Sequence, residues 1–409
     1  MIDSRARKSS GGVVRRLPVA LAAVSVLAAA ATGIAGAQPV VPSLPFGGLS
    51  YTVRVQQPGI AAGDIFYTSG VSAAALVPGV GAVAKLLPGG QPANVIADRS
   101  GRVLEQYTPP AGQDVSNFRT QVYQGRKVLT WWQGSTVAGH GSGVGIIADE
   151  NFNVLATVDP GGAGADVHEF RLTPDGHALL TSYPEVNADL TAIGGPKDGK
   201  MFDTVAIVMD VASGKELFRW SAADHVPLTD SETNGKLNGD VYDPYHMNSI
   251  SQDASGNLVI SLRNTATVYD VDPHTGDINW QLGGKSPTIA ADPGIEFAFQ
   301  HDAEFTDDST LRLFNNNSDG LESRGPSSVE WIHVDPVAKR ATLVRNQQHP
   351  DGLVSMAMGN AQTLLNGDTF VSWGMVPRLS EFDAQGNLVY DAALPFGSYR
   401  AYIDTWPVS

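Results

Sequence analysis

Three of the nine histidines recur at one position of a repeated sequence pattern. His168, His246 and His301 each begin a short strand-like run, and the first leucine of the following run lies 11, 12 and 10 residues further on. Arg263 ends the second run of the unit that His246 begins. A neutral imidazole can act as a nucleophile, a protonated imidazole donates hydrogen bonds, and a guanidinium offers a planar pair of donors to sulfate or phosphate. The pattern therefore predicts a site for an anionic, oxygen-rich group.

Two asparagines extend this expected site. Asn248 lies two residues after His246, and alternate residues of a strand point to the same side. Asn360 occupies roughly the histidine position in the last repeat. We expect both amides to join the same site and to contact the substrate.

The same histidines could instead hold zinc or another divalent metal. The fixed positive charge of Arg263 opposes the binding of a cation nearby. The sequence also lacks the H-E-x-x-H pair of zinc enzymes and the D-x-D-x-D pattern of calcium loops. We therefore predict neither a metal nor a cofactor for this site.

The other histidines are interpreted as structural. One of them lies in the glycine-rich run Gly139-His140-Gly141-Ser142-Gly143, between two predicted strands. A phosphate or dinucleotide loop needs a following helix, and a nucleophile elbow needs the spacing G-x-S-x-G, so this run fits neither. The rest fall in hairpin turns, an outer strand, an insertion or before a proline: His177, His274, His333, His225 and His349.

The elements that must position these residues are strands. Short alternating runs, separated by D-x-x-G, D-G, N-G and T-G turns, predict strands joined by hairpins. The runs recur as six larger units, four clear and two weaker. Six four-stranded sheets packed radially bury one another's faces, which predicts an all-β, six-bladed β-propeller over residues 61–400. A pair of β-sandwiches is the alternative fold, but it does not explain why the same order of strands and turns recurs along the chain. The clear units are residues 168–220, 246–280, 301–344 and 357–391.

A propeller would bring the three histidines together, because its inner strands line a central channel and their first residues meet at one mouth. The units average about 62 residues, more than the ~40–45 of a compact blade. We therefore expect insertions, most clearly at residues 184–204 and 221–245. Residues 38–60 are rich in proline and are expected to wrap the surface or close the ring.

Composition and the N-terminus restrict the class of protein. The formal net charge is −15, whereas a nucleic-acid binder needs a basic face. The absence of cysteine excludes disulfides and thiol catalysis. Residues 1–37 combine basic residues, an Ala-rich apolar stretch and a small-residue cleavage site, which predicts a secretory signal peptide, with an uncleaved membrane anchor as the alternative. No later stretch is apolar and long enough to span a bilayer, so we expect an exported, extracellular or cell-envelope protein.

Four short motifs occur in a fixed order along the chain. They are His168-Glu169-Phe170, the H-x-N-S of residues 246–249, the S-x-R-N of residues 261–264 and the Q-H-D of residues 300–302. Together they resemble the bacterial arylsulfate sulfotransferase (arylsulfotransferase) family, as a divergent branch, over roughly residues 90–395. The resemblance implies a six-bladed propeller with its active site at the channel mouth. It also implies transfer of a sulfuryl group from a phenolic sulfate ester to a phenol, without a nucleotide sulfate donor.

The resemblance also implies roles for the site residues. His301 matches the nucleophile, which becomes a sulfohistidine in a ping-pong reaction. His168, His246, Asn248 and Arg263 match residues that bind and polarise the sulfuryl oxygens. The implied partners are a small aryl sulfate donor and a phenolic acceptor.

Two other functions remain open on the sequence. A non-catalytic propeller could bind an anionic ligand or polymer through the same ring of cationic residues. A propeller dehydrogenase with a quinone cofactor is the third possibility, because Asp-x-x-x-Gly turns followed by Trp280 superficially match its repeats. The dehydrogenase would need a calcium site, and the sequence has no acidic cluster for one.

Overall fold

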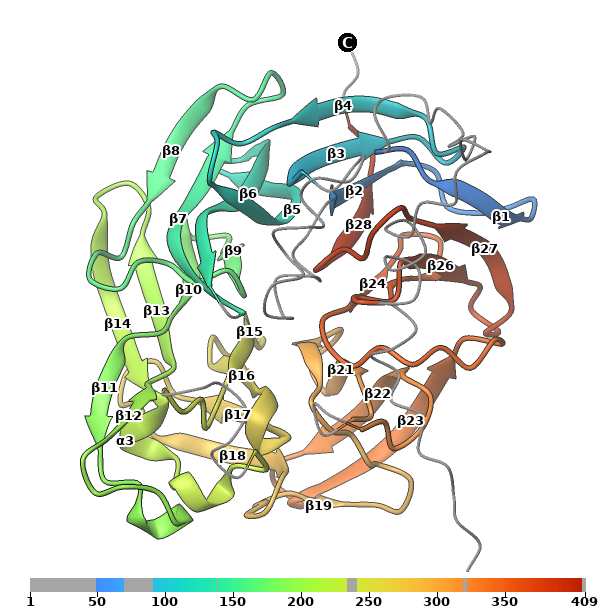
Figure 1. Ribbon diagram of the computed structural model, residues 1–409. Coiled ribbons are helices and arrows are strands. Elements are labelled where there is room, and N and C mark those ends of the chain that lie inside the picture. The colour runs from blue at the N-terminus through green and yellow to red at the C-terminus, as the bar shows by residue number, and fades with distance from the viewer. Residues whose placement is uncertain (1–48, 70–90, 138, 234–240, 319–321, 407–409) are drawn as a thin grey trace, which may run out of the picture. The chain divides into compact units, whose positions relative to one another are not determined.

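Six sheets arranged around a common centre form the blades of the computed structural model, which describes residues 49–69, 91–137, 139–233, 241–318 and 322–406 (Figure 1). Each sheet contains four strands in meander order, and two of the sheets carry one additional strand. The predicted all-β, six-bladed β-propeller is confirmed. The expected signal peptide, residues 1–37, lies outside the described residues.

The first three blades follow one another along the chain. In blades 2 and 3 the first strand lies nearest the centre, and the last strand lies outermost (Figure 1). Blade 1 comprises β2(Asp64–Ser69), β3(Ala93–Ala97) and β4(Val103–Tyr107); blade 2 comprises β5(Asp114–Tyr123), β6(Arg126–Val137), β7(His140–Ala148) and β8(Val154–Val158); blade 3 comprises β9(Phe170–Leu172), β10(His177–Ser182), β13(Val205–Asp210) and β14(Lys215–Ser221).

The last three blades repeat this order. A short strand, β19(Ala290–Ala291), adds to blade 5 by parallel pairing with the outermost strand of that blade. Blade 4 comprises β15(Met247–Gln252), β16(Leu258–Leu262), β17(Thr267–Val271) and β18(Ile278–Gly283); blade 5 comprises β20(His301–Phe305), β21(Thr310–Asn315), β22(Ser328–Asp335) and β23(Arg340–Gln348); blade 6 comprises β24(Asn360–Thr363), β25(Thr369–Ser372), β26(Arg378–Phe382) and β27(Leu388–Ala393).

Both ends of the described chain help to close the ring. The C-terminal strand β28(Ala401–Asp404) pairs antiparallel with β2 and becomes the inner strand of blade 1. The N-terminal strand β1(Thr52–Gln56) pairs antiparallel with β27 and becomes the fifth strand of blade 6. Each terminal strand therefore ties the first blade region to the last, which leaves few open strand edges.

The D-x-x-G pattern forms tight hairpin turns through one repeated contact. In four hairpins an aspartate Oδ1 accepts hydrogen bonds from the main-chain N–H groups two and four residues further on, at Asp98, Asp149, Asp253 and Asp383. Three of these turns have the D-x-x-G pattern, whereas the fourth residue of the Asp149 turn is Phe152. The fourth residue of the Asp253 turn, Gly256, has a φ of 88°, a left-handed conformation that glycine adopts without steric cost.

The core lies between the blades rather than inside any one of them. In β16, Ile260 packs in the cluster shared by blades 3 and 4, whereas its neighbour Val259 packs in the cluster shared by blades 4 and 5. Neighbouring residues of a strand point to opposite faces of its sheet, so a strand buried on both faces supplies two cores. A central strand such as β16, whose five residues are all buried, is therefore apolar on both faces and departs from the alternation expected of the repeats.

The longest insertions lie in blade 3 and after it. β11(Glu185–Ala188) and β12(Gly199–Phe202) form a separate hairpin between β10 and β13, and η3(Thr191–Ile193) lies in its loop. α3(Ala222–His225) and η4(Leu228–Asp230) follow β14. Within the described part of the chain, none of the helices has the length and apolar character needed to cross a membrane.

Candidate active site

Three of the predicted site residues come together where the inner strands of blades 3, 4 and 5 begin. The ring centroids of His168 and His246 are 4.6 Å apart, and the Tyr399 ring lies 5.7 Å from His168 and 6.3 Å from His301. His246 has a φ of 55°, a conformation that costs energy for a residue other than glycine. Such strain is typical of side chains that the surrounding fold forces into a fixed place.

Arg263 is the cation of this site. It begins the short helix η5(Arg263–Thr265) between β16 and β17, its guanidinium lies 4.2 Å from the centre of the Phe299 ring, and Nη1 donates to Asn264. No carboxylate among the described residues pairs with it, and its buried Nε has no hydrogen-bond partner there. Burial lowers the pKa of Arg263 to about 10, so the group stays cationic at neutral pH. A cation with free donors and no carboxylate partner suits an anionic ligand.

The three imidazoles differ in what holds their Nδ1 atoms. His168 Nδ1 bonds to Asp166, and His246 Nδ1 lies 2.5 Å from Asp243 Oδ2. His301 Nδ1 instead lies 2.6 Å from the amide Oδ1 of Asn316. Two of the rings therefore face a carboxylate, whereas the third faces a neutral acceptor.

The environment of Asn316 fixes the tautomer of His301. The Asn316 Nδ2 donates to the carbonyls of Ser355 at 2.8 Å and Met358 at 3.0 Å, so its oxygen must face the imidazole. His301 Nδ1 then carries the proton, and Nε2 carries the lone pair, which accepts from the Met358 N–H at 3.2 Å. Burial and the charge of Arg263 hold the pKa of His301 well below its usual range. His301 is thus a neutral imidazole whose lone pair lies on Nε2, the form in which a histidine can act as a nucleophile.

Several residues of the site were not predicted from the sequence. Tyr183 and Tyr399 lie 5.5 and 5.7 Å from the ring of His168, centroid to centroid. His140, interpreted above as a structural loop residue, begins β7, and its ring lies 5.5 Å from that of His246. Its Nε2 is 3.1 Å from Asp243 Oδ2.

The two predicted asparagines have different surroundings from the histidines. Asn248 Nδ2 donates to Gln300 O at 2.7 Å and so joins blade 4 to the residue before His301. Both polar atoms of Asn360 pair with the main chain of Ala401, at 2.9 Å each. The Asn360 amide thus holds the closing strand β28, and each of its two polar atoms has a main-chain partner.

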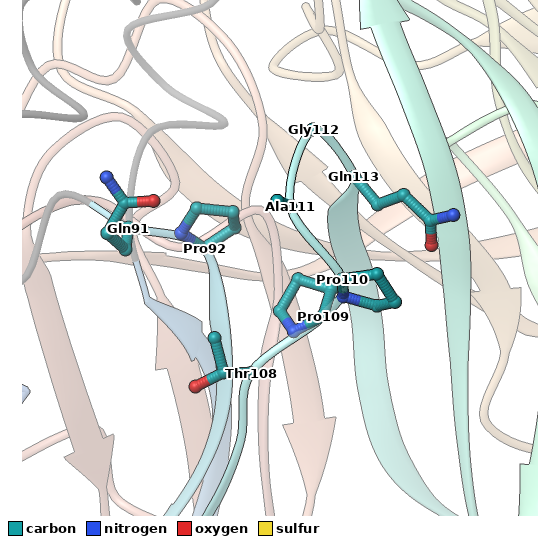
Figure 2. Close-up of a pocket in the computed structure, with 8 residues that line it drawn as sticks. All are labelled: Gln91, Pro92, Thr108, Pro109, Pro110, Ala111, Gly112 and Gln113. Carbon is teal, nitrogen blue, oxygen red and sulfur yellow. The ribbon is translucent and has the colours of Figure 1, made fainter.

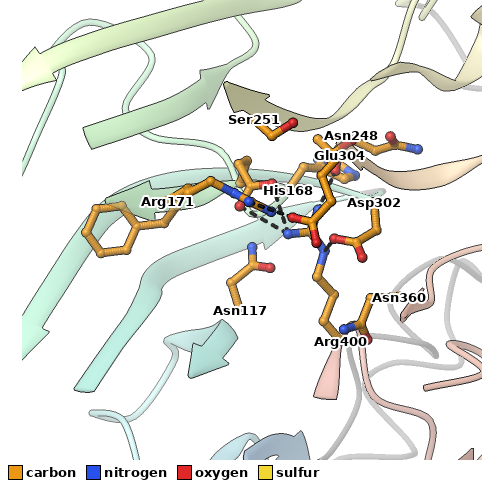
Figure 3. A network of polar contacts seen from close by, with 12 residues as sticks. Asn117, His168, Arg171, Asn248, Ser251, Asp302, Glu304, Asn360 and Arg400 are labelled. Carbon is orange, nitrogen blue, oxygen red and sulfur yellow. Dashed lines mark hydrogen bonds and ion pairs between the residues drawn. The ribbon is translucent and has the colours of Figure 1, made fainter. Parts of the chain in front are cut away.

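A buried network of charges lies next to His168 (Figure 3). Arg400 donates from Nη1 to both oxygens of Glu169, at 3.0 and 2.9 Å, and from Nη2 to Asn248 O at 2.8 Å. Its Nε lies 3.6 Å from Asp302. Glu169 and Asp302 directly follow His168 and His301. The same chain segments therefore carry a histidine of the site and an acid of the network.

The network predicts a large stability effect at Arg400. Arg400→Met should lower the free energy of unfolding by about 3–5 kcal/mol, because it leaves buried carboxylates without their principal partner. Urea denaturation measures this change. Arg219→Met is the matched control: it breaks an exposed pair with Glu216 and should cost no more than about 1 kcal/mol. Equal losses in the two variants would contradict the structural role of Arg400.

One group of atoms in the site has the composition of a metal site. The possible ligand atoms of His140, Asp243 and His246 all lie within 4.8 Å of one another. Two ligands of one zinc ion, each about 2.1 Å from it, stand roughly 3.4 Å apart in a tetrahedral site. The 2.5 Å between His246 Nδ1 and Asp243 Oδ2 is shorter and has the length of a strong hydrogen bond. The present arrangement therefore fits two imidazoles that donate hydrogen bonds to Asp243 better than it fits three ligands of a metal ion.

A separate cavity of about 90 Å³ opens between blades 1 and 2, where β4 leads into β5 (Figure 2). None of its lining side chains is an acid or a base, in contrast to the group of imidazoles described above. Its lining residues are Gln91, Pro92, Thr108, Pro109, Pro110, Ala111, Gly112 and Gln113.

Comparison with known proteins gives one family and several similar folds. The family model described as arylsulfotransferase (ASST) matches residues 119–394. No curated protein matches the chain. Similar solved structures include a protein of unknown function from Bacteroides caccae (14% identity, TM-score 0.49, covering 83% of this chain and 98% of that one) and the periplasmic gluconolactonase of Pseudomonas aeruginosa (10% identity, TM-score 0.44, covering 84% and 99%).

Proposed function

The chain belongs to the arylsulfotransferase family, and from this premise we propose that it transfers a sulfuryl group from an aryl sulfate to a phenol through a sulfohistidine at His301. The observation that carries the proposal is the contrast between the imidazoles. His301 is held by the neutral amide of Asn316, whereas His168 and His246 are held by carboxylates. A neutral, oriented imidazole suits a nucleophile, and a carboxylate-bound imidazole suits a group that gains and loses a proton.

The first half-reaction forms a nitrogen–sulfur bond. His301 Nε2 leaves its hydrogen bond with the Met358 N–H and attacks sulfur, and the bond between sulfur and the aryl oxygen breaks. The departing phenolate takes a proton from His168 Nε2, while His168 Nδ1 stays bound to Asp166. His246 stays neutral, because burial lowers its pKa to about 4. Arg263 donates to the sulfuryl oxygens and stabilises the charge that develops on them.

The second half-reaction reverses these events. An acceptor phenol gives its proton to the imidazole that lost one, and its oxygen attacks sulfur. The nitrogen–sulfur bond breaks, and His301 returns as a neutral imidazole. The proton and the sulfuryl group therefore balance over one turnover, and no nucleotide donor or metal takes part.

Asn248 and Asn360 are assigned to support in this scheme. Their amide N–H groups donate to the main chain, one beside His301 and one at the closing strand. We also retain the expectation of export from the pattern of residues 1–37. Cell fractionation with a C-terminal epitope tag tests that part separately.

Trapping the intermediate tests the proposal. A chromogenic aryl sulfate without acceptor should release one equivalent of phenol per enzyme, and mass spectrometry should locate the added sulfuryl group on His301. Addition of a phenol should then discharge it. A non-catalytic propeller would instead bind free sulfate and release no phenol with any ester.

The role of Asn316 gives a further prediction. Asn316→Leu has a similar volume but no acceptor for His301 Nδ1, so we expect kcat to fall by at least about 10²-fold, as when a catalytic histidine loses its tautomer. The burst rate in stopped-flow measurements reports this loss.

Asn315→Leu is the matched control. Asn315 is also buried and uses its amide fully, but its partners include Glu296, Ala298 and Glu330 rather than His301. It should lose comparable stability and keep its burst rate. A slow burst in both variants would assign the effect of Asn316 to folding alone.

A further inference from the structure

Two histidines of this site bind a single carboxylate oxygen. Asp243 Oδ2 lies 2.5 Å from His246 Nδ1 and 3.1 Å from His140 Nε2. Burial alone would raise the pKa of Asp243, but the two imidazoles outweigh it and hold this pKa below its usual range. Asp243 is therefore a buried anion that accepts from both rings.

The ring of His140 is fixed from two other sides. Phe202, at the end of the inserted hairpin strand β12, stacks on it with centroids 4.4 Å apart and an interplanar angle of 28°. Tyr183 lies 4.8 Å away, centroid to centroid. His140 thus cannot turn freely, and its Nε2 stays directed at Asp243.

Several titratable or charged groups surround His246, and His140 acts on His246 through one of them. They are Asp243 and His140 on one side, His168 and Tyr183 at ring distances of 4.6 and 6.0 Å, and the charge of Arg263. Asp243 is the carboxylate that bonds to the His246 ring. The orientation of that carboxylate therefore sets the orientation of the imidazole.

We propose that His140 is a positioning residue of the sulfuryl-transfer site. By donating from Nε2 to Asp243 Oδ2, it fixes the carboxylate that holds His246 Nδ1–H, so that the lone pair on His246 Nε2 accepts a hydrogen bond from the phenol. This inference rests on the proposed function. Partners that orient a functional histidine in this way commonly contribute about 10- to 100-fold to activity.

Two substitutions of His140 separate its hydrogen bond from its ring. His140→Phe keeps an aromatic ring between Phe202 and Tyr183 but cannot donate to Asp243. His140→Gln removes the ring but places an amide N–H near the position of Nε2. We expect kcat to fall by about 10- to 100-fold in His140→Phe, with KM nearly unchanged, and to stay within about 3-fold of wild type in His140→Gln.

The pH dependence adds a readout that folding does not move. Without the second donor, the negative charge of Asp243 acts on His246 alone and raises the pKa of His246, which burial otherwise lowers to about 4. Because His246 accepts the hydrogen bond from the phenol in its neutral form, activity is lost as the pH falls through its pKa. The acid limb of kcat/KM should therefore move to higher pH in His140→Phe and stay in place in His140→Gln.

A spectroscopic measurement keeps the inference separate from the proposed function. In protein labelled with ¹⁵N at histidine, the His246 signals should show a protonated Nδ1 in wild type and His140→Gln, and averaged ring nitrogens in His140→Phe. Unchanged His246 signals in His140→Phe would overturn the inference even if transfer occurs. Equal activity losses in both variants, or a stoichiometric divalent metal that His140→Gln releases, would overturn it as well. Absence of any sulfuryl transfer in wild type, with the spectroscopic change intact, would reject only the proposed function.

Discussion

We expect His301→Ala to lower kcat/KM for an aryl sulfate by at least about 10⁴-fold and to abolish the phenol burst, because the variant lacks the nitrogen that accepts the sulfuryl group in the proposed mechanism. Binding of the ester should persist, since Arg263, His168 and His246 remain. A burst experiment without acceptor, followed by a binding titration with the same ester, measures the two quantities separately.

His349→Ala is the matched control for this experiment. His349 is also buried, but it contacts blade 6 instead of the other histidines of the site. Its Nε2 lies 3.3 Å from Asp391, which belongs to β27. Its loss should reduce stability and leave the burst amplitude at one equivalent per enzyme. A full burst from His301→Ala would show that His301 is not the nucleophile. His168 and His246 would then be the remaining candidates for that role.

The convergence of His168, His246 and His301 could be predicted because repetition carries geometric information. Residues at one phase of successive repeats meet at one mouth of a propeller, whatever their separation along the chain. The identification of the fold followed from the same repeats and the hairpin turns. No comparable rule indicates what each imidazole bonds to.

The hydrogen-bond partners depend on loops whose conformation the sequence pattern does not define. Asn316 follows β21, and its orientation comes from two carbonyls about 40 residues further along the chain. Tyr399 and Arg400 reach the site only because β28 closes blade 1. The Arg400–Glu169 contact spans 231 positions, a separation that local patterns cannot reveal.

His140 shows a signal that was present in the sequence but was interpreted differently. Glycines alternate around it, and a Cβ at Gly141 would lie 2.6 Å from Trp132, whereas one at Gly145 would lie 2.4 Å from the Phe170 ring. Alternating glycines therefore mark a strand face packed too closely for side chains. His140 and Ser142 occupy the opposite face, so the run is a strand that presents an imidazole and not a loop for phosphate.

Arg263→Gln should lower kcat/KM by about 10²- to 10³-fold at neutral pH, because it removes donors aimed at the developing charge of the sulfuryl group. It should also change the pH profile. Arg263 is the second-largest cause, after burial, of the lowered pKa of His301, so this pKa should rise in the variant. Because the nucleophile must be neutral, activity is present above this pKa and is lost as the pH falls through it. The acid limb should therefore move to higher pH than in wild type.

Arg263→Lys separates charge from geometry in the same measurement. A lysine keeps the positive charge near His301 but not the planar pair of donors, so the rate should fall while the acid limb stays near its wild-type position. If both variants move the limb equally, the pKa of His301 does not depend on the charge at this position. If neither lowers the rate, the sulfuryl oxygens do not meet the guanidinium. Only a rate loss in both variants, with a shifted limb in Arg263→Gln alone, agrees with a cation that binds the sulfuryl group and also keeps its acceptor nitrogen unprotonated.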